Sequence, residues 1–74
     1  MTFGQAYDDA KARGLMAPGR RVERRPARWP VGHEFGGKYF PRRRVVAILG
    51  LVTGLHRGKQ EVWVLEELTP APVV

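Results

Sequence analysis

The sequence predicts an α+β fold in which one N-terminal helix packs on a small antiparallel sheet that contains a C-terminal β-hairpin. Three features predict it: helical periodicity near the start, a nearly continuous apolar run in the middle, and a β-rich segment after a glycine-containing loop. The 74 residues fit one small domain, residues 1–74, with an expected free energy of unfolding of about 3–5 kcal/mol. There are no cysteines, so packing rather than disulfides must supply this stability.

A helix is predicted over residues 3–13. Thr2 is a favoured N-cap residue, and Gln5 follows three positions later, as in a capping box. Gly14 suits the position just after a helix, where Leu15 can fold back on the last turn. The apolar residues recur at helical spacing and form one stripe: Phe3, Ala6, Tyr7 and Ala10.

Three segments have the character of strands. Residues 20–25 are predicted to form a short strand in which Val22 points inward and all its neighbours are charged. A strand this polar is expected at a sheet edge. Residues 43–53 are rich in Val, Ile and Leu at successive positions, which indicates that both faces of this strand are covered. One face would be covered by the helix and the other by a second layer or a partner. Residues 61–68 complete the hairpin across a loop at 54–60.

The remaining segments are expected to be irregular. Residues 30–37 contain four Pro or Gly and form a loop, from which Val31 and Phe35 plug the core. Residues 38–40 form a short strand, and the tail at 69–74 is flexible.

Two residues of the central apolar run carry separate expectations. Gly50 marks a bulge or a close approach of the backbone. Ile48 is expected in the core, so its replacement by Ala should cost roughly 2–5 kcal/mol.

Catalytic and metal chemistry have little support in this composition. The chain has no Ser and no Cys, and its three Thr residues lack a neighbouring base in the sequence. The adjacent acids at 8–9 and at 66–67 diverge on a helix or strand and are expected to be solvated. His33 and His56 are too far apart in sequence to suggest a metal site. We therefore expect no enzyme, no cofactor and no metal.

The chain is expected to act in the cytoplasm without a membrane anchor. Its start has no apolar segment of the signal-peptide type. The longest apolar run, residues 45–52, is far shorter than the roughly 20 residues of a membrane helix.

The formal net charge of +6 is concentrated in one part of the chain. Nine cations lie between residues 20 and 44 against two acids, whereas the segment from residue 61 onward has three acids and no cation. This asymmetry predicts a polarised molecule with a positive face. The candidate partner-binding residues are these clustered arginines and two interleaved aromatic residues: Arg20, Arg21, Arg24, Arg25, Arg28, Trp29, Tyr39, Arg42, Arg43 and Arg44.

Three interpretations of this cluster remain open. Trp, Tyr and Arg dominate protein-binding hot spots, so the cluster suits a protein partner, with nucleic acid close to the interface. Arginines next to aromatic residues also suit direct nucleic-acid binding by phosphate contacts and stacking. In the third interpretation the arginines are only solvated, and Trp29 and Phe40 belong to the core. If the arginines are exposed, changing Arg24, Arg25, Arg43 and Arg44 to Gln should leave the fold intact while partner affinity falls.

Two resemblances point to phage accessory proteins. The opening MTFGQAYDDAKARG, the segment RRVERRPARWP and the chain length resemble the small transcription regulators of lytic phages that infect Xanthomonas. This resemblance implies binding to host RNA polymerase near the N-terminus of its largest subunit, inhibition of initiation, and antitermination.

The second resemblance is to a phage family that opens FGEALEALKxGxxVxRxGW. It is carried by FGxA at residues 3–6, Lys11, Gly14, GRRV at residues 19–22 and Trp29. Some members of that family sequester a cyclic nucleotide defence signal, which would make this chain a small-ligand sponge. The chain departs from the pattern by the insertion LMAPG and by PARW, so the resemblance implies a shared fold more than a shared ligand. The oligomeric state remains open.

Overall fold

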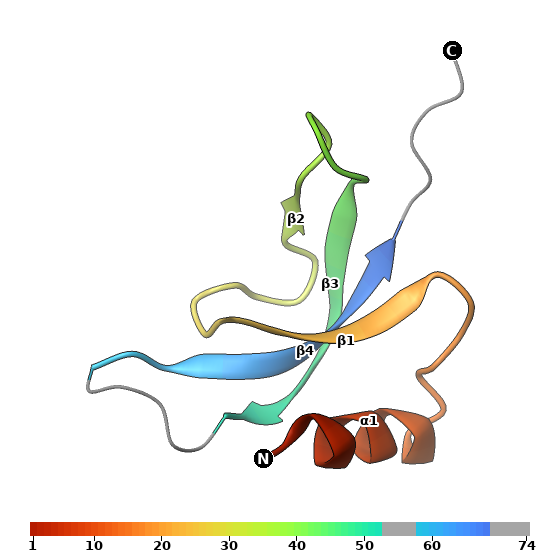
Figure 1. Ribbon diagram of the computed structural model, residues 1–74, viewed down its shortest axis with the longest axis vertical. Helices are drawn as coiled ribbons and strands as arrows, with labels where there is room; N and C mark the ends of the chain where they lie inside the picture. The colour runs from red at the N-terminus through yellow and green to blue at the C-terminus, as the bar shows by residue number, and fades with distance from the viewer. Residues whose placement is uncertain (53–57, 69–74) are drawn as a thin grey trace.

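The computed structural model describes residues 1–52 and 58–68, and it has the predicted α+β fold (Figure 1). Its four strands form one antiparallel sheet in the order β1-β4-β3-β2, so the two hairpin strands β3 and β4 lie at the centre. The helix packs on the sheet and contacts β1, β3 and β4. The elements are α1 (Phe3–Ala12), β1 (Arg20–Pro26), β2 (Glu34–Phe35), β3 (Arg43–Leu51) and β4 (Glu61–Leu68).

Local signals set both ends of α1. The Thr2 hydroxyl accepts a hydrogen bond from the Gln5 amide at 3.2 Å, and the Gln5 side chain accepts one from the Thr2 amide at 2.8 Å, which confirms the capping box. The helix ends at Ala12, one residue earlier than predicted, and the Leu15 amide donates to the Ala10 carbonyl at 3.0 Å. The stripe is narrower than predicted, because Ala6 and Ala10 are its only buried members.

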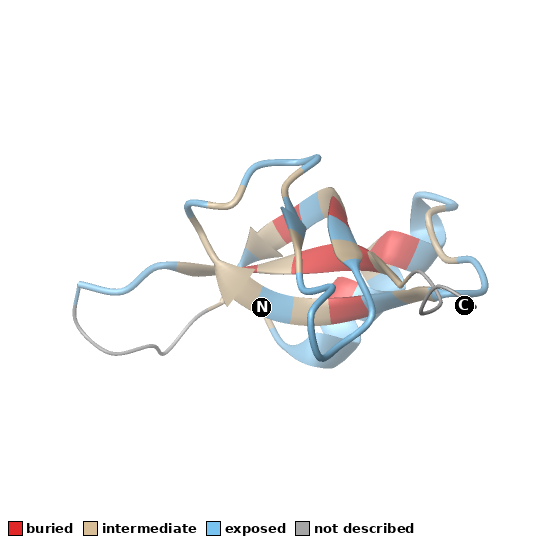
Figure 2. Ribbon diagram, turned by 90° about the horizontal axis from the view of Figure 1, so that it is seen from above, coloured by how far each residue is buried: buried red, intermediate tan, exposed pale blue. Residues whose placement is uncertain are grey.

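The apolar core forms two clusters, one on each face of the sheet, so each face of the central strands is covered over part of its length, while Ile48 stays 39% exposed. Figure 2 shows buried segments in the middle of the sheet and on the helix. The first cluster lies under α1 and consists of Ala6, Ala10, Val22, Leu49 and Leu65. The second consists of Val45, Val62 and Val64, packed against Ala27, Trp29 and Phe35. The second cover is therefore supplied by the chain that links β1 to β3.

The segment between β1 and β3 corrects two predictions. Residues 38–40 are not a strand; they form a bend, because Gly36 and Gly37 adopt positive φ and turn the chain just before them. A two-residue strand, β2, lies instead within the predicted loop and pairs with Arg43–Arg44. Phe35 packs against the second cluster, as predicted. Val31 is 59% exposed and does not contribute to the core, so that part of the prediction is wrong.

The central strand also corrects an expectation. Ile48 is 39% exposed, so the prediction that it lies in the core is wrong, and we now expect a smaller cost for Ile48→Ala. The β3–β4 register shifts between Val45 and Ala47 and again between Ile48 and Gly50, and the bulge predicted at Gly50 is present. The segment between β1 and β3 packs through Ala27, Trp29 and Phe35 on the second cluster, to which Ile48 does not belong. β3 ends at Leu51, before the predicted end at residue 53. Residue 53, most of the loop at 54–60 and the tail at 69–74 lie outside the described residues.

Candidate functional site

The acidic strand β4 lies between β1 and β3, so charges far apart in the sequence become neighbours. Glu66 is fully buried, and the guanidinium group of Arg25 donates to both of its carboxylate oxygens, with Nη2–Oε2 at 3.1 Å. Arg43 Nη1 lies 3.6 Å from Glu66 Oε2 on the other side. The expectation that the carboxylates at 66–67 are solvated is therefore wrong for Glu66, because pairing replaces its hydration.

Glu23 extends this buried cluster. Its Oε2 atom lies 2.6 Å from Arg25 Nη2 and 3.7 Å from Arg43 Nη1, and its other oxygen pairs with Arg21. Burial lowers the pKa of the Arg25 guanidinium, but the hydrogen bond and charge of Glu66, with the charge of Glu23, outweigh it and raise that pKa overall. Arg25 is therefore a fixed cation within the fold and contributes no free charge to a partner.

Three further candidate arginines form more exposed pairs. Arg44 Nη2 lies 2.5 Å from Glu67 Oε2, and the equivalent distances are 3.1 Å for Arg24 Nε to Glu61 Oε2 and 2.8 Å for Arg42 Nη2 to Glu34 Oε2. Exposed pairs of this kind contribute about 0–1 kcal/mol each. The predicted separation into a basic and an acidic part does not hold, because the sheet intersperses the acids of β4 with the arginines. The paired candidates are Arg21, Arg24, Arg25, Arg42, Arg43 and Arg44.

The other four candidates have different surroundings. Arg20 donates from Nη1 to the Leu15 carbonyl at 2.7 Å, which ties β1 to the end of the helix. Trp29 is half-buried and stacks on His33, with ring centroids 4.5 Å apart. Its ring is tilted against that of Phe35, at 4.7 Å, so it covers the second cluster. Tyr39 and Arg28 are exposed, and they lie in two different surface features.

The first feature is the aromatic tip, which we define as residues 36–41. Tyr39 is 82% exposed and Phe40 is 70% exposed, which is unusual for side chains of this size. The turn is closed by a hydrogen bond from the Gly37 amide to the Phe40 carbonyl at 2.9 Å. Gly36 has φ +79°, and a Cβ atom there would lie 2.8 Å from the Pro41 carbonyl oxygen, so only glycine fits. Beside the tip is a hollow of about 250 Å³ that Phe35, Phe40 and Pro41 help to line.

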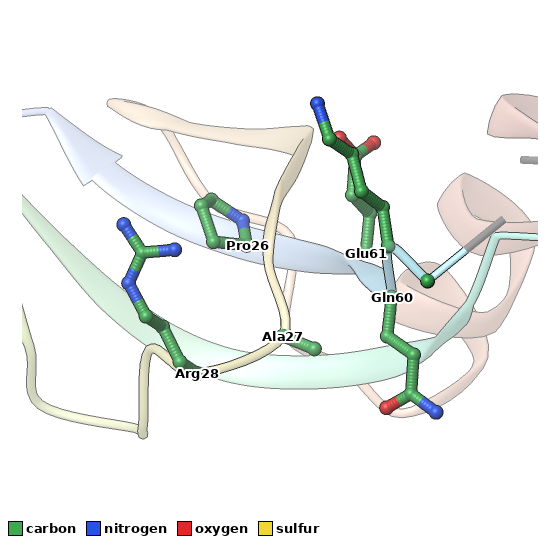
Figure 3. A pocket seen from close by; sticks show the side chains of 7 residues that line it. Pro26, Ala27, Arg28, Gln60 and Glu61 are labelled. Atoms are coloured by element: carbon green, nitrogen blue, oxygen red, sulfur yellow. The ribbon is translucent and has the colours of Figure 1, made fainter. Parts of the chain in front are cut away.

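The second feature is the basic hollow, a space of about 380 Å³ between the turn after β1 and the residues before β4 (Figure 3). The Ala27 amide donates to the Gln60 carbonyl at 3.2 Å and holds its two sides together. Figure 3 shows the side chains of Arg28 and Glu61 extending to one side of the chain and that of Gln60 to the other. The residues that line the hollow are Pro26, Ala27, Arg28, Gly58, Lys59, Gln60 and Glu61.

Sequence reasoning missed Lys59, Phe40 and Glu66 as site residues. Lys59 lies in a loop far from the arginine cluster, and only the β1–β4 register brings it to the hollow with Arg28. The exposure of Phe40 depends on the turn at Gly36 and Gly37. The signal for Glu66 was weak but present: strand alternation places it on the same face as Val62 and Val64, and a charge buried on such a face requires a partner.

Residues 1–52 and 58–68 contain no group of three or more His, Asp or Glu side chains placed to hold a metal ion. No helix among them is long and apolar enough to cross a membrane.

Comparison with known proteins returned no match: no family model, no curated protein and no solved structure is similar to this chain.

Proposed function

We propose that this chain is a non-catalytic phage protein that binds bacterial RNA polymerase in the host cytoplasm, inhibiting initiation and promoting antitermination by contact alone. The observation that carries the binding function is the aromatic tip, with two large aromatic side chains held in solvent. The choice of polymerase as partner is supported by the resemblance in size, basic character and layout to small phage transcription regulators. The lack of Ser and Cys in the sequence supports a role without catalysis.

The tip has the physical properties of a binding hot spot. Large aromatic side chains contribute most binding free energy when they enter a pocket on a partner. They dominate the binding free energies measured at protein interfaces. The turn at Gly36 and Gly37 and the closing hydrogen bond restrain the backbone of the tip, so little conformational entropy is lost on binding. Lys38 Nζ lies 5.4 Å from the Tyr39 ring centroid, which places a cation beside the aromatic group and favours an acidic partner surface.

The ion pairs within the sheet favour a protein partner over direct nucleic-acid binding by the arginine cluster. Six of its eight arginines already contact carboxylates, and a phosphate would have to displace those contacts. An arginine contributes counterion-release affinity only where its charge is available to a phosphate. The cluster is therefore poorly arranged to track a nucleic-acid backbone.

The first prediction concerns the tip. The double variant Tyr39→Ala, Phe40→Ala should weaken binding to purified Xanthomonas RNA polymerase by on the order of 30-fold or more, because both anchors are removed. Val31→Ala is the matched control, since Val31 is also an exposed apolar loop residue, and it should bind like the parent. Calorimetric titration measures both variants, with circular dichroism to confirm that each is folded. A parent protein that does not bind polymerase, or a tip variant that binds equally well, would contradict the proposal.

Salt dependence separates the two classes of partner. An interface anchored by aromatic groups should keep most of its affinity between 50 and 200 mM salt, whereas contacts to six or more phosphates would lose roughly three orders of magnitude. The same titration at both salt concentrations, with nuclease-treated polymerase, gives the answer. A loss of that size would favour direct nucleic-acid binding.

A further inference from the structure

The basic hollow contains the side chains of two cations from distant parts of the sequence. Arg28 follows β1 and Lys59 precedes β4, and the pairing of Pro26 with Glu61 sets the two segments side by side. Both residues are exposed, and neither makes an ion pair with a carboxylate in the described part of the chain. The residues outside that part, 53–57 and 69–74, contain no Asp or Glu.

The local charge balance of the hollow is positive. Glu61 also lines it, but Arg24 Nε lies 3.1 Å from Glu61 Oε2 and offsets that carboxylate. The net charge of this group is two positive charges, from three cations and one carboxylate: Arg24, Arg28, Lys59 and Glu61. The sheet neutralises most of the arginine cluster internally, whereas the hollow keeps its two charges facing solvent.

We propose that the basic hollow binds a phosphate group, with Arg28 and Lys59 neutralising its charge. A guanidinium fork and an ammonium group on opposite walls suit a phosphate, because its several oxygens can accept from two directions at once. A carboxylate has only two oxygens, in one plane, and a single arginine fork is enough to bind it.

Glu61 narrows the class of ligand. Its Oε2 atom is buried and accepts no aligned hydrogen bond from the described residues, although Arg24 balances its charge. A small rotation of the Glu61 side chain, which is about one-third exposed, would bring this oxygen into the hollow, where a ligand hydroxyl beside the phosphate would donate to it. The ligand class is therefore a phosphate ester with a neighbouring hydroxyl, either a free sugar phosphate or the ribose-phosphate backbone of RNA.

The test uses the full chain and ribose 5-phosphate as the probe, with binding followed by calorimetry and by NMR shifts of the Ala27 and Gln60 amides. Arg28→Gln and Lys59→Gln should each weaken binding about tenfold, because each removes one charged donor. Lys11→Gln is the matched control: it removes one charge from an exposed helical lysine over the Tyr7 ring, and it should change binding less than twofold. All three replacements are at exposed positions, so folding should change by no more than about 0.5 kcal/mol.

Further ligands distinguish the sources of the phosphate. Inorganic phosphate should bind more weakly than ribose 5-phosphate, because it lacks the neighbouring hydroxyl. An eight-nucleotide RNA that binds at least tenfold tighter than ribose 5-phosphate, and tighter than the same DNA, identifies the RNA backbone as the source; equal affinity identifies a free sugar phosphate. Equal weakening by Lys11→Gln, no saturable binding of any phosphate, or no difference between the two small ligands would overturn the proposal. The Tyr39→Ala, Phe40→Ala variant should still bind phosphate. The phosphate proposal and the polymerase proposal can therefore be contradicted independently of each other.

Discussion

Replacing Arg25 by Met should remove about 3–5 kcal/mol from the free energy of unfolding, which is the usual cost of leaving a buried charge without its partner. Glu66 is fully buried, and Arg25 donates a hydrogen bond to each of its carboxylate oxygens, so the variant leaves this carboxylate with Arg43 at 3.6 Å. A domain of this size has only about 3–5 kcal/mol to lose, so most of the variant should be unfolded at 25 °C. Urea unfolding followed by circular dichroism measures the loss.

Two further variants show whether burial causes the effect. Arg44→Met breaks the exposed pair with Glu67 and should cost no more than about 1 kcal/mol. Adding Glu66→Gln to Arg25→Met should recover part of the loss, because a buried charge without its partner costs more than a neutral group at the same place. Equal losses for Arg25→Met and Arg44→Met would show that the buried pair contributes no more than a surface pair.

The same cluster reverses an expectation from the sequence. Changing Arg24, Arg25, Arg43 and Arg44 together to Gln was expected to leave the fold intact, on the assumption that all four are exposed. Arg25 and Arg43 are four-fifths buried and hold Glu66, so we expect this variant to be largely unfolded. Partner affinity measured on it would report loss of folding.

The parts of the fold that sequence predicted are those specified by nearby residues. The capping box at Thr2 and Gln5 and the turn after Ala12 depend on hydrogen bonds within a few positions, so α1 was predicted to within one residue. The polar character of residues 20–25 likewise placed β1 at the sheet edge. The two-residue β2 has no periodicity to detect, and its pairing with β3 depends on the turn between them.

The candidate site was harder to predict because its properties depend on strand order. The arginines of β1 and β3 looked unopposed in the sequence, yet placing β4 between them supplies Glu61, Glu66 and Glu67 as partners. The same register brings Lys59 to Arg28. Pattern reasoning singled out Tyr39 and Arg28 as candidates for partner binding, and both are exposed, but it could not separate them from candidates used in packing, such as Trp29.

Leu65 and Ile48 give the sharpest test of where the core lies. Leu65 has no exposed surface, pairs with Val22 on one side and Ala47 on the other, and belongs to the cluster under α1. Leu65→Ala should therefore cost about 2–5 kcal/mol, from lost burial and from a cavity that the small helix residues Ala6 and Ala10 cannot fill.

Ile48→Ala is the matched control, because it also shortens a large aliphatic residue in a central strand. Ile48 is 39% exposed, so its loss leaves an open surface instead of a cavity, and we expect a cost of about 1 kcal/mol or less. Urea midpoints measured at unchanged slope give both values. If Ile48→Ala unfolds at lower urea than Leu65→Ala, the second face must be covered in solution, and Ile48 would then lie in a contact with another molecule.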